Sequence, residues 1–160
     1  MTISVGDRLP DATFMTMTEA GPQKISSSEV FAGQKVVLFA VPGAFTPTCH
    51  AKHLPGFVQQ VEAIRAKGVD RIACVAVNDV FVLGAWAKQL GADGIQFLSD
   101  GRGLFTRSIG METDPPERPY GPRSGRYAMI VDDGKVTALF VEKSPAEVIE
   151  SSAEKVLAAL

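Results

Sequence analysis

Long apolar runs, an excess of charge of either sign and a set of cysteines are all missing from this 160-residue sequence. No apolar stretch approaches the roughly 20 residues that a membrane-spanning helix needs, and the N-terminus lacks the basic and then apolar segments of a signal peptide. The 18 acidic and 16 basic residues nearly balance, so neither nucleic acid nor a membrane surface is expected as a partner. Two cysteines, Cys49 and Cys74, are too few for a disulfide framework. We therefore expect a cytoplasmic protein with reduced thiols.

The residues that are present fit one globular domain over positions 1–160. Hydrophobic residues make up 46% of the chain and charged residues 21%, which is typical of folded rather than disordered proteins. A chain of this length is long enough to bury a single core. Because the sequence shows no internal repeat, linker or low-complexity segment, nothing divides it further.

Hydrophobic periodicity predicts strands that alternate with helices. Strand patterns cover 14–18, 36–41, 72–77, 95–98, 127–131 and 136–142, and helical patterns cover 25–31, 57–67, 80–90, 104–109 and 144–160. The uninterrupted apolar run at 36–41 is typical of a strand buried on both faces. The turn Asp132-Asp133-Gly134 predicts a hairpin between the last two strands. This order is typical of an α/β, thioredoxin-like sandwich with a central mixed β-sheet flanked by helices.

Several local signals add detail to this fold. The alternating segment 14–18 predicts an edge strand, and Gly21-Pro22 after it predicts a turn. The proline-rich stretch 112–124 predicts a long loop, which makes a functional role worth considering. Ser144-Pro145, with a glutamate two residues later, is typical of a helix start. We expect the last helix to carry an apolar stripe from Ile149 to Leu160.

Cys49 lies where a buried strand has ended and a helix begins. The unpaired amides and the dipole of a helix start favour a negative charge there, and therefore the nucleophilic thiolate. Thr46 can turn its hydroxyl toward the sulfur or toward an oxygen bound beside it, and Pro42, which has no amide hydrogen, can shield the pocket from water. A thiolate in such a pocket suits attack on a compact electrophile with a polar bond. The alternative is a buried structural thiol, because free cysteine is often a core residue.

Two other residues bear on this site. Cys74 lies in the middle of an apolar strand with nothing nearby to stabilise a thiolate, so we expect a core residue. Arg126 directly precedes the predicted strand 127–131, and Arg123 lies three residues before Arg126. An arginine in this place is more often solvated. From a strand edge, however, its guanidinium could reach the sulfur, favour the thiolate and polarise a bound oxygen.

Three other kinds of cysteine chemistry are disfavoured. Cys49, His50 and His53 spell C-H-x-x-H, but a structural zinc needs four ligands and the chain has no further histidine. The His53 side chain is then a hydrogen-bonding residue packed near the site. The absence of an arginine six residues after Cys49 excludes a cysteine phosphatase, and the absence of C-x-x-C argues against a dithiol reductase. We expect neither a metal nor another cofactor.

The spacing P-x-x-x-T-x-x-C, formed by Pro42, Thr46 and Cys49, resembles the active-site signature of the peroxiredoxins. The longer strings VPGAFTPTCHAKHLPGF, ACVAVND and RYAMIVDDG are similar to those of the peroxiredoxin-five, or type II, subfamily. The resemblance covers nearly the whole chain. It implies a thiol-dependent peroxidase that reduces hydrogen peroxide and small alkyl hydroperoxides.

The resemblance also implies a role for each matching residue. Cys49 matches the peroxidatic cysteine, whose thiolate attacks one peroxide oxygen and becomes sulfenic acid. Thr46 matches the residue that hydrogen-bonds the substrate, Pro42 the one that shields the thiolate, and Arg126 the arginine that activates thiolate and peroxide.

Backbone amides are expected to line the same pocket, namely those of Ala44, Phe45 and Cys49. The family usually has glycine where this sequence has Thr48, a difference that affects the freedom of the loop or access to the pocket.

The same resemblance bears on partners. Some members carry a resolving cysteine late in the chain, but 137–144 contains none. This predicts a one-cysteine mechanism with an external thiol, either glutathione with glutaredoxin or thioredoxin. Phe45, Phe81 and the proline-rich loop could form a homodimer surface. Two rival functions are a peroxide sensor or relay that oxidises a partner protein, and a non-catalytic interaction module.

Overall fold

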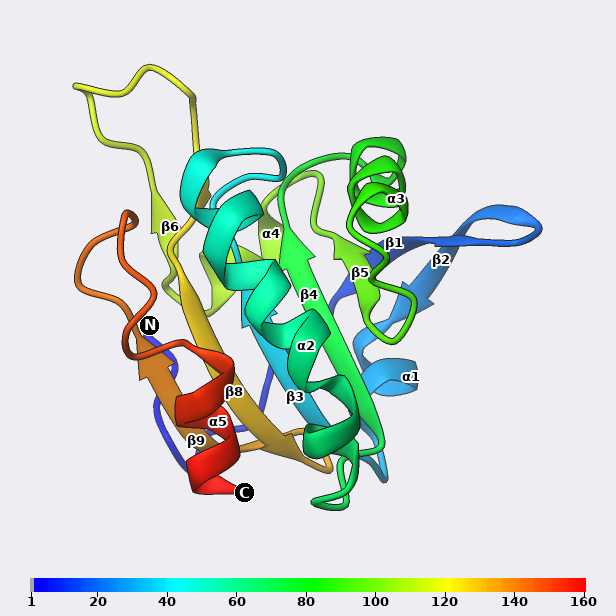
Figure 1. Ribbon diagram of the computed structural model, residues 1–160. Coiled ribbons are helices and arrows are strands. Elements are labelled where there is room, and N and C mark those ends of the chain that lie inside the picture. Colours follow the sequence, from blue (N-terminus) through cyan, green and yellow to red (C-terminus); the bar gives the residue numbers. More distant parts are fainter. Residues whose placement is uncertain (1) are drawn as a thin grey trace.

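The computed structural model describes residues 2–160 and is built around one seven-stranded sheet (Figure 1). The strand order is β2-β1-β5-β4-β3-β8-β9. The bounds are β1 (Thr13–Thr18), β2 (Gly21–Ser26), β3 (Lys35–Ala40), β4 (Arg71–Ala76), β5 (Gln96–Ser99), β8 (Tyr127–Asp132) and β9 (Lys135–Val141). β4 pairs in parallel with β3 and β5, and the other neighbours are antiparallel. The predicted α/β architecture with a mixed central sheet is confirmed.

Helices cover both faces of this sheet. They are α1 (Ser27–Phe31), α2 (Leu54–Arg65), α3 (Val80–Gln89), α4 (Leu104–Ser108) and α5 (Ala153–Ala159). Side chains alternate along a strand, so Val37 and Phe39 of β3 join one core with α2, α3 and α5. Val36 and Leu38 join a second core with α1 and α4. Figure 1 shows α2 and α5 side by side on one face.

The two central strands, β3 and β4, place the loop that leads to Cys49 at one end of the sheet. β3 and β4 are apolar and buried nearly throughout, as expected for strands covered on both faces. Because they run in parallel, with Phe39 opposite Cys74, their carboxyl ends point the same way. The loop that follows β3 leads to Cys49, and the loop that follows β4 leads to Asp79, whose side chain caps the start of α3. A site at the carboxyl ends of parallel strands is the usual arrangement in α/β folds.

The first hairpin differs from the prediction. β1 is not an edge strand, because it pairs with both β2 and β5. Gly21 and Pro22 do not form the turn but begin β2, which is the real edge strand and was not predicted. Its sequence, GPQKIS, has one large apolar residue and therefore no clear alternation. An edge position also explains the tolerance of Pro22, since the amide that a proline lacks is not needed there.

The last helix begins later than predicted. Residues 143–152 form turns and bends, and α5 starts after Ser152, whose side chain accepts from the Lys155 amide. Ile149 is 56% exposed and does not belong to an apolar helical stripe. The physical reason is that the amides of residues 149–151 donate to the Glu142 side chain instead of to the carbonyls of a helix. The pattern Ser144-Pro145 is therefore a turn.

The remaining connections agree with the sequence pattern. Asp133 and Gly134 have positive φ values of 48° and 80° and close the predicted hairpin between β8 and β9. The proline-rich stretch is a loop whose ends pair as the short strands β6 (Glu112–Thr113) and β7 (Arg123–Ser124). It projects from the end of the sheet near the helix that carries Cys49 (Figure 1). Among residues 2–160, none of the helices is long and apolar enough to cross a membrane.

Candidate active site

Cys49 opens a widened helical turn between β3 and α2. Residues 49–53 form a π-helical turn, η1 (Cys49–His53), in which the Leu54 amide donates to the Cys49 carbonyl. Pro55 follows directly, and a proline lacks the amide that regular helical bonding requires. The helix expected from residue 57 therefore begins earlier, as a π-turn that continues directly into α2. Such turns are rare and frequently occur at functional sites.

The sulfur of Cys49 lies against a buried guanidinium. The cysteine is fully buried and accepts a hydrogen bond of 2.9 Å at Sγ from Nη2 of Arg126. Arg126 is itself only 3% exposed, and an arginine stays protonated even when buried. Neither of the ion pairs formed within residues 2–160 involves Arg126. Since a buried cation without a counter-charge is strongly destabilising, this contact favours the thiolate form of Cys49.

His53 holds the other side of the same guanidinium. Its Nδ1 lies 2.9 Å from Nη1 of Arg126, and its Nε2 lies 2.9 Å from the Ser151 carbonyl oxygen. A guanidinium only donates, so Nδ1 must accept and Nε2 must carry the hydrogen. Burial, together with the nearby charge of Arg126, lowers the pKa of His53 to about 3. The imidazole is therefore neutral at pH 7, and both of its nitrogens are engaged.

Three acceptors fix the orientation of Arg126. Besides Cys49 and His53, the carbonyl oxygen of Pro145 accepts from Nε at 3.1 Å. Three bonds to one planar group leave its plane little freedom. Arg126 reaches the sulfur, as the sequence suggested. The sequence did not point to Pro145 or Ser151, because each contributes a backbone carbonyl, which carries no sequence signal.

Pro42 and Thr46 lie with Arg126 along a cleft of about 1030 Å³. The far walls of this cleft belong to the proline-rich loop and to residues 142–146. The hydroxyl of Thr46 donates to the Gly43 carbonyl at 2.6 Å. Its hydrogen is thereby used, and the oxygen lone pairs remain available to accept a hydrogen bond from a ligand. The lining of the cleft thus includes the Thr46 hydroxyl as an acceptor, Pro42, and Arg126, whose guanidinium contacts the buried sulfur.

The Ala44 amide and the Phe45 side chain both bond or pack within the protein. Phe45 has a positive φ of 62°, and its ring stacks on His50 with 5.9 Å between centroids. The His50 ring in turn accepts from Nε1 of Trp86 at 3.0 Å. The Ala44 amide donates to Oδ1 of Asn78 at 2.9 Å, so it is not free to bind a ligand as the resemblance implied. The aromatic side chain of Phe45 is part of a stacked cluster and does not line the cleft.

Arg123 crosses the mouth of the site. A Cβ atom added to Gly43 would lie 2.6 Å from Nη1 of Arg123, so the glycine is what allows this close approach. The guanidinium also lies over the Tyr120 ring, 4.8 Å from its centroid. Arg123 therefore links the loop after β3 to the proline-rich loop, a role that its sequence position did not reveal.

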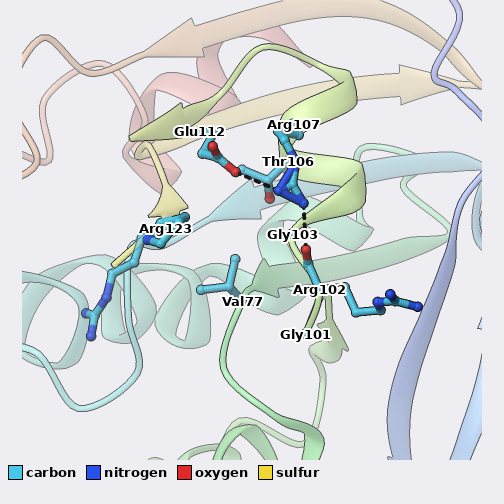
Figure 2. A pocket seen from close by; sticks show the side chains of 9 residues that line it. Val77, Gly101, Arg102, Gly103, Thr106, Arg107, Glu112 and Arg123 are labelled. Atoms are coloured by element: carbon cyan, nitrogen blue, oxygen red, sulfur yellow. Dashed lines mark hydrogen bonds and ion pairs between the residues drawn. The ribbon is translucent and has the colours of Figure 1, made fainter. Parts of the chain in front are cut away.

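A smaller hollow of about 270 Å³ lies on the other side of Arg123 (Figure 2). Arg107 spans it, donating to Glu112 at 3.3 Å and to the Arg102 carbonyl at 2.8 Å. These bonds tie α4 to β6, at the base of the proline-rich loop. In Figure 2 the side chains of Arg102 and Arg123 point away from one another, so their charges do not converge on this hollow. The bonds of Arg107 therefore anchor the base of the proline-rich loop, which forms a wall of the larger cleft.

Comparisons with known proteins agree on one family. The family model described as Redoxin matches residues 4–157. Peroxiredoxin-2B of Arabidopsis thaliana is 46% identical over 160 residues, which cover 99% of this chain and 98% of the relative. The crystal structure of reduced Prx3 in complex with H2O2 from Vibrio vulnificus matches with a TM-score of 0.93 and 49% identity, covering 99% of each chain. This chain belongs to the peroxiredoxins.

The peroxiredoxin assignment confirms the fold and the activity that the motif implied. The fold is the thioredoxin-like sandwich, and the protein is a thiol peroxidase that consumes peroxide at the expense of thiols. The type II subfamily fits the names of the Arabidopsis relatives, among them the chloroplastic peroxiredoxin-2E at 49% identity over 99% of this chain and 69% of the relative. A 1-Cys peroxiredoxin, the antioxidant protein of Plasmodium falciparum, matches with a TM-score of 0.88 at 30% identity over 96% of each chain.

Proposed function

We propose that Cys49 is the peroxidatic cysteine of this thiol peroxidase. Its thiolate attacks one oxygen of the peroxide, the O–O bond breaks, and the second oxygen leaves as hydroxide or alkoxide and takes up a proton. Cys49 becomes sulfenic acid. The observation that carries this proposal is the 2.9 Å contact between Sγ and the buried guanidinium of Arg126. The same charge stabilises the negative charge that develops on the leaving oxygen.

Pro42 and Thr46 complete the reacting geometry in this proposal. The free lone pairs of the Thr46 hydroxyl accept the hydrogen of the peroxide, which orients its O–O bond toward the sulfur. Pro42 lines the cleft beside them and offers no donor that could hold water near the sulfur. Phe45 contributes to the substrate pocket only through its backbone, since its ring packs on His50.

The reaction cycle uses one cysteine of the chain. An external thiol attacks the sulfenic acid, water leaves and a mixed disulfide forms. A second thiol then releases reduced Cys49 and carries away the disulfide. Cys74 is a poor resolving residue because it is fully buried in the middle of β4. Burial, and then the neighbouring Cys49, raise the pKa of the Cys74 thiol, so little of it is available as a nucleophile.

The size and charge of the cleft support small alkyl hydroperoxides and a carboxylate-bearing thiol as ligands. A volume of about 1030 Å³ far exceeds what hydrogen peroxide requires. Beside the acidic residues Asp114, Glu117 and Glu142, the lining carries Arg118, Arg123 and Lys143, which take part in neither of the ion pairs formed within residues 2–160. These cations suit the carboxylates of glutathione. We therefore rank glutathione with glutaredoxin first as the reductant and thioredoxin second.

Two further proposals concern the protein outside the site. Three exposed aromatic side chains, Phe45, Phe81 and Tyr120, favour a homodimer that buries them. The cytoplasmic location stays a prediction from the sequence.

The test treats the reduced enzyme with one equivalent of peroxide in the absence of thiol and measures its mass. We expect one added oxygen on wild type and none on Cys49→Ser. An intramolecular disulfide between Cys49 and Cys74 as the main product would overturn the one-cysteine mechanism. Steady-state turnover with glutathione and glutaredoxin, and separately with thioredoxin, then identifies the reductant. A relay to a partner protein predicts oxidation without such turnover.

A further inference from the structure

The segment after β9 surrounds the guanidinium of Arg126 without being a helix or a strand. Its carbonyl at Pro145 accepts from Nε of Arg126, and its carbonyl at Ser151 lies against His53. The backbone is joined to Arg126 once more, because the Glu142 amide donates to the Arg126 carbonyl at 3.1 Å. Residues 143–152 form turns and bends. Something other than regular secondary structure must therefore hold these two carbonyls in place.

The Glu142 carboxylate is that anchor. Its oxygens accept from the amides of Ile149, Glu150 and Ser151 at 2.9, 3.1 and 2.6 Å. They also accept from the Ser151 hydroxyl at 2.6 Å. Bonds between a carboxylate and neutral donors are short and strong compared with neutral pairs. Burial alone raises the pKa of the Glu142 carboxyl, but these donors outweigh it and lower the pKa below its ordinary value. The anchor is thus ionised at neutral pH.

We propose that Glu142 is a positioning residue for the reactive thiolate, acting through Ser151, His53 and Arg126. By fixing the Ser151 carbonyl, Glu142 gives Nε2 of His53 a partner for its hydrogen and so keeps Nδ1 as an acceptor. That acceptor, with the Pro145 carbonyl, holds the guanidinium plane so that Nη2 points at Sγ of Cys49. Four links of 2.6 to 2.9 Å connect the carboxylate to the sulfur. Glu142 also lines the cleft, but its carboxylate bonds to residues 149–151 and not to the sulfur.

The decisive variant is Glu142→Gln, which keeps the shape but replaces a carboxylate oxygen by a donor. The matched control is Glu150→Gln, because the Glu150 side chain only forms an exposed 4.0 Å ion pair with Lys155. We expect Glu142→Gln to shift the midpoint of the ultraviolet thiolate absorbance of Cys49 upward in pH. We also expect the second-order rate with hydrogen peroxide to fall about fivefold, the equivalent of one net hydrogen bond. Glu150→Gln should change neither.

Two results would overturn the proposal. The first is a Glu142→Gln protein of lowered melting temperature whose thiolate titration and peroxide rate match wild type, because Glu142 would then be structural only. The second needs no variant and holds even if Glu142→Gln fails to fold. Nitrogen chemical shifts of His53 in the wild-type enzyme should report a neutral ring with hydrogen on Nε2 at pH 7. A hydrogen on Nδ1, or a protonated ring, would mean that His53 cannot accept from Arg126, and the proposal would be wrong.

Discussion

Cys49 and Cys74 are both fully buried and belong to the same core, yet their surroundings differ in one respect that decides their chemistry. Cys49 begins a helical turn and accepts a hydrogen bond from a charged guanidinium. Cys74 lies in the middle of β4, where burial first and then the neighbouring Cys49 raise the pKa of its thiol, against a smaller lowering effect of the Arg126 charge. Burial therefore says little about reactivity. In the proposed mechanism, the donor placed at the sulfur is what makes this core thiol a nucleophile.

Removing each sulfur in turn is the largest test of this contrast. Cys49→Ser should abolish peroxidase activity, since a serine hydroxyl at neutral pH is not an ionised nucleophile. Cys74→Ala should keep the turnover of wild type and lose only about 1 kcal/mol of stability through the small cavity it leaves. Steady-state peroxide consumption and thermal unfolding measure the two effects. Loss of turnover in a folded Cys74→Ala enzyme would show that the buried thiol takes part in the cycle.

Changing the guanidinium should bring Cys49 closer to the state of Cys74. Arg126→Gln is expected to reduce the second-order rate with peroxide by about 100- to 1,000-fold, as when an enzyme loses one donor to its transition state. Arg126→Lys keeps the charge but loses the fork that contacts Cys49, His53 and Pro145 together, so a smaller loss is expected. Stopped-flow measurement of the peroxide step checks both. Equal losses in the two variants would mean that the fork geometry matters and the charge does not.

The neutral histidine beside the guanidinium makes a prediction about acid stability. The pKa of His53 is about 3 in the folded protein against an ordinary value of 6.5. The unfolded chain thus takes up a proton more readily, and folding stability falls as the pH drops from 6.5 toward 3, by at most about 1.4 kcal/mol for each pH unit. In His53→Asn the part of this pH dependence of folding stability that His53 contributes should vanish. Denaturant unfolding between pH 7 and pH 4 provides the comparison, and an unchanged slope would contradict the assigned protonation.

The smallest expected effect concerns the mouth of the site. Gly43→Ala would place a methyl group 2.6 Å from the present position of Nη1 of Arg123, which is the end of a flexible side chain and can move. We expect a loss of a few-fold in the peroxide rate, about 1 kcal/mol, because Thr46, 3.2 Å from the same methyl, must also shift. Arg123→Ala made together with Gly43→Ala should recover part of that loss. No recovery would place the strain at Thr46 alone.

The same contrast shows how far the sequence leads. The central strands, the helix start at Cys49 and the Asp133-Gly134 turn follow from local patterns, because apolar runs and positive φ values leave clear signals. The motif also pointed to Arg126. What it could not show is how Arg126 is held, since Pro145 and Ser151 act through carbonyl groups that any residue possesses. The sequence also predicts a helix from residue 144, because Ser144-Pro145 is locally typical of a helix start; the bonds to the distant Glu142 carboxylate, which hold residues 149–151 instead, leave no local signal.

The most direct test of the central claim is a pH titration of the Cys49 thiolate by ultraviolet absorbance in the Cys74→Ala background, where one thiol remains. We predict that Cys49 is ionised at pH 7 and reacts rapidly with hydrogen peroxide, and that Arg126→Gln in the same background moves the transition to higher pH. A thiol that is fully protonated at pH 7 and inert toward hydrogen peroxide would contradict the account.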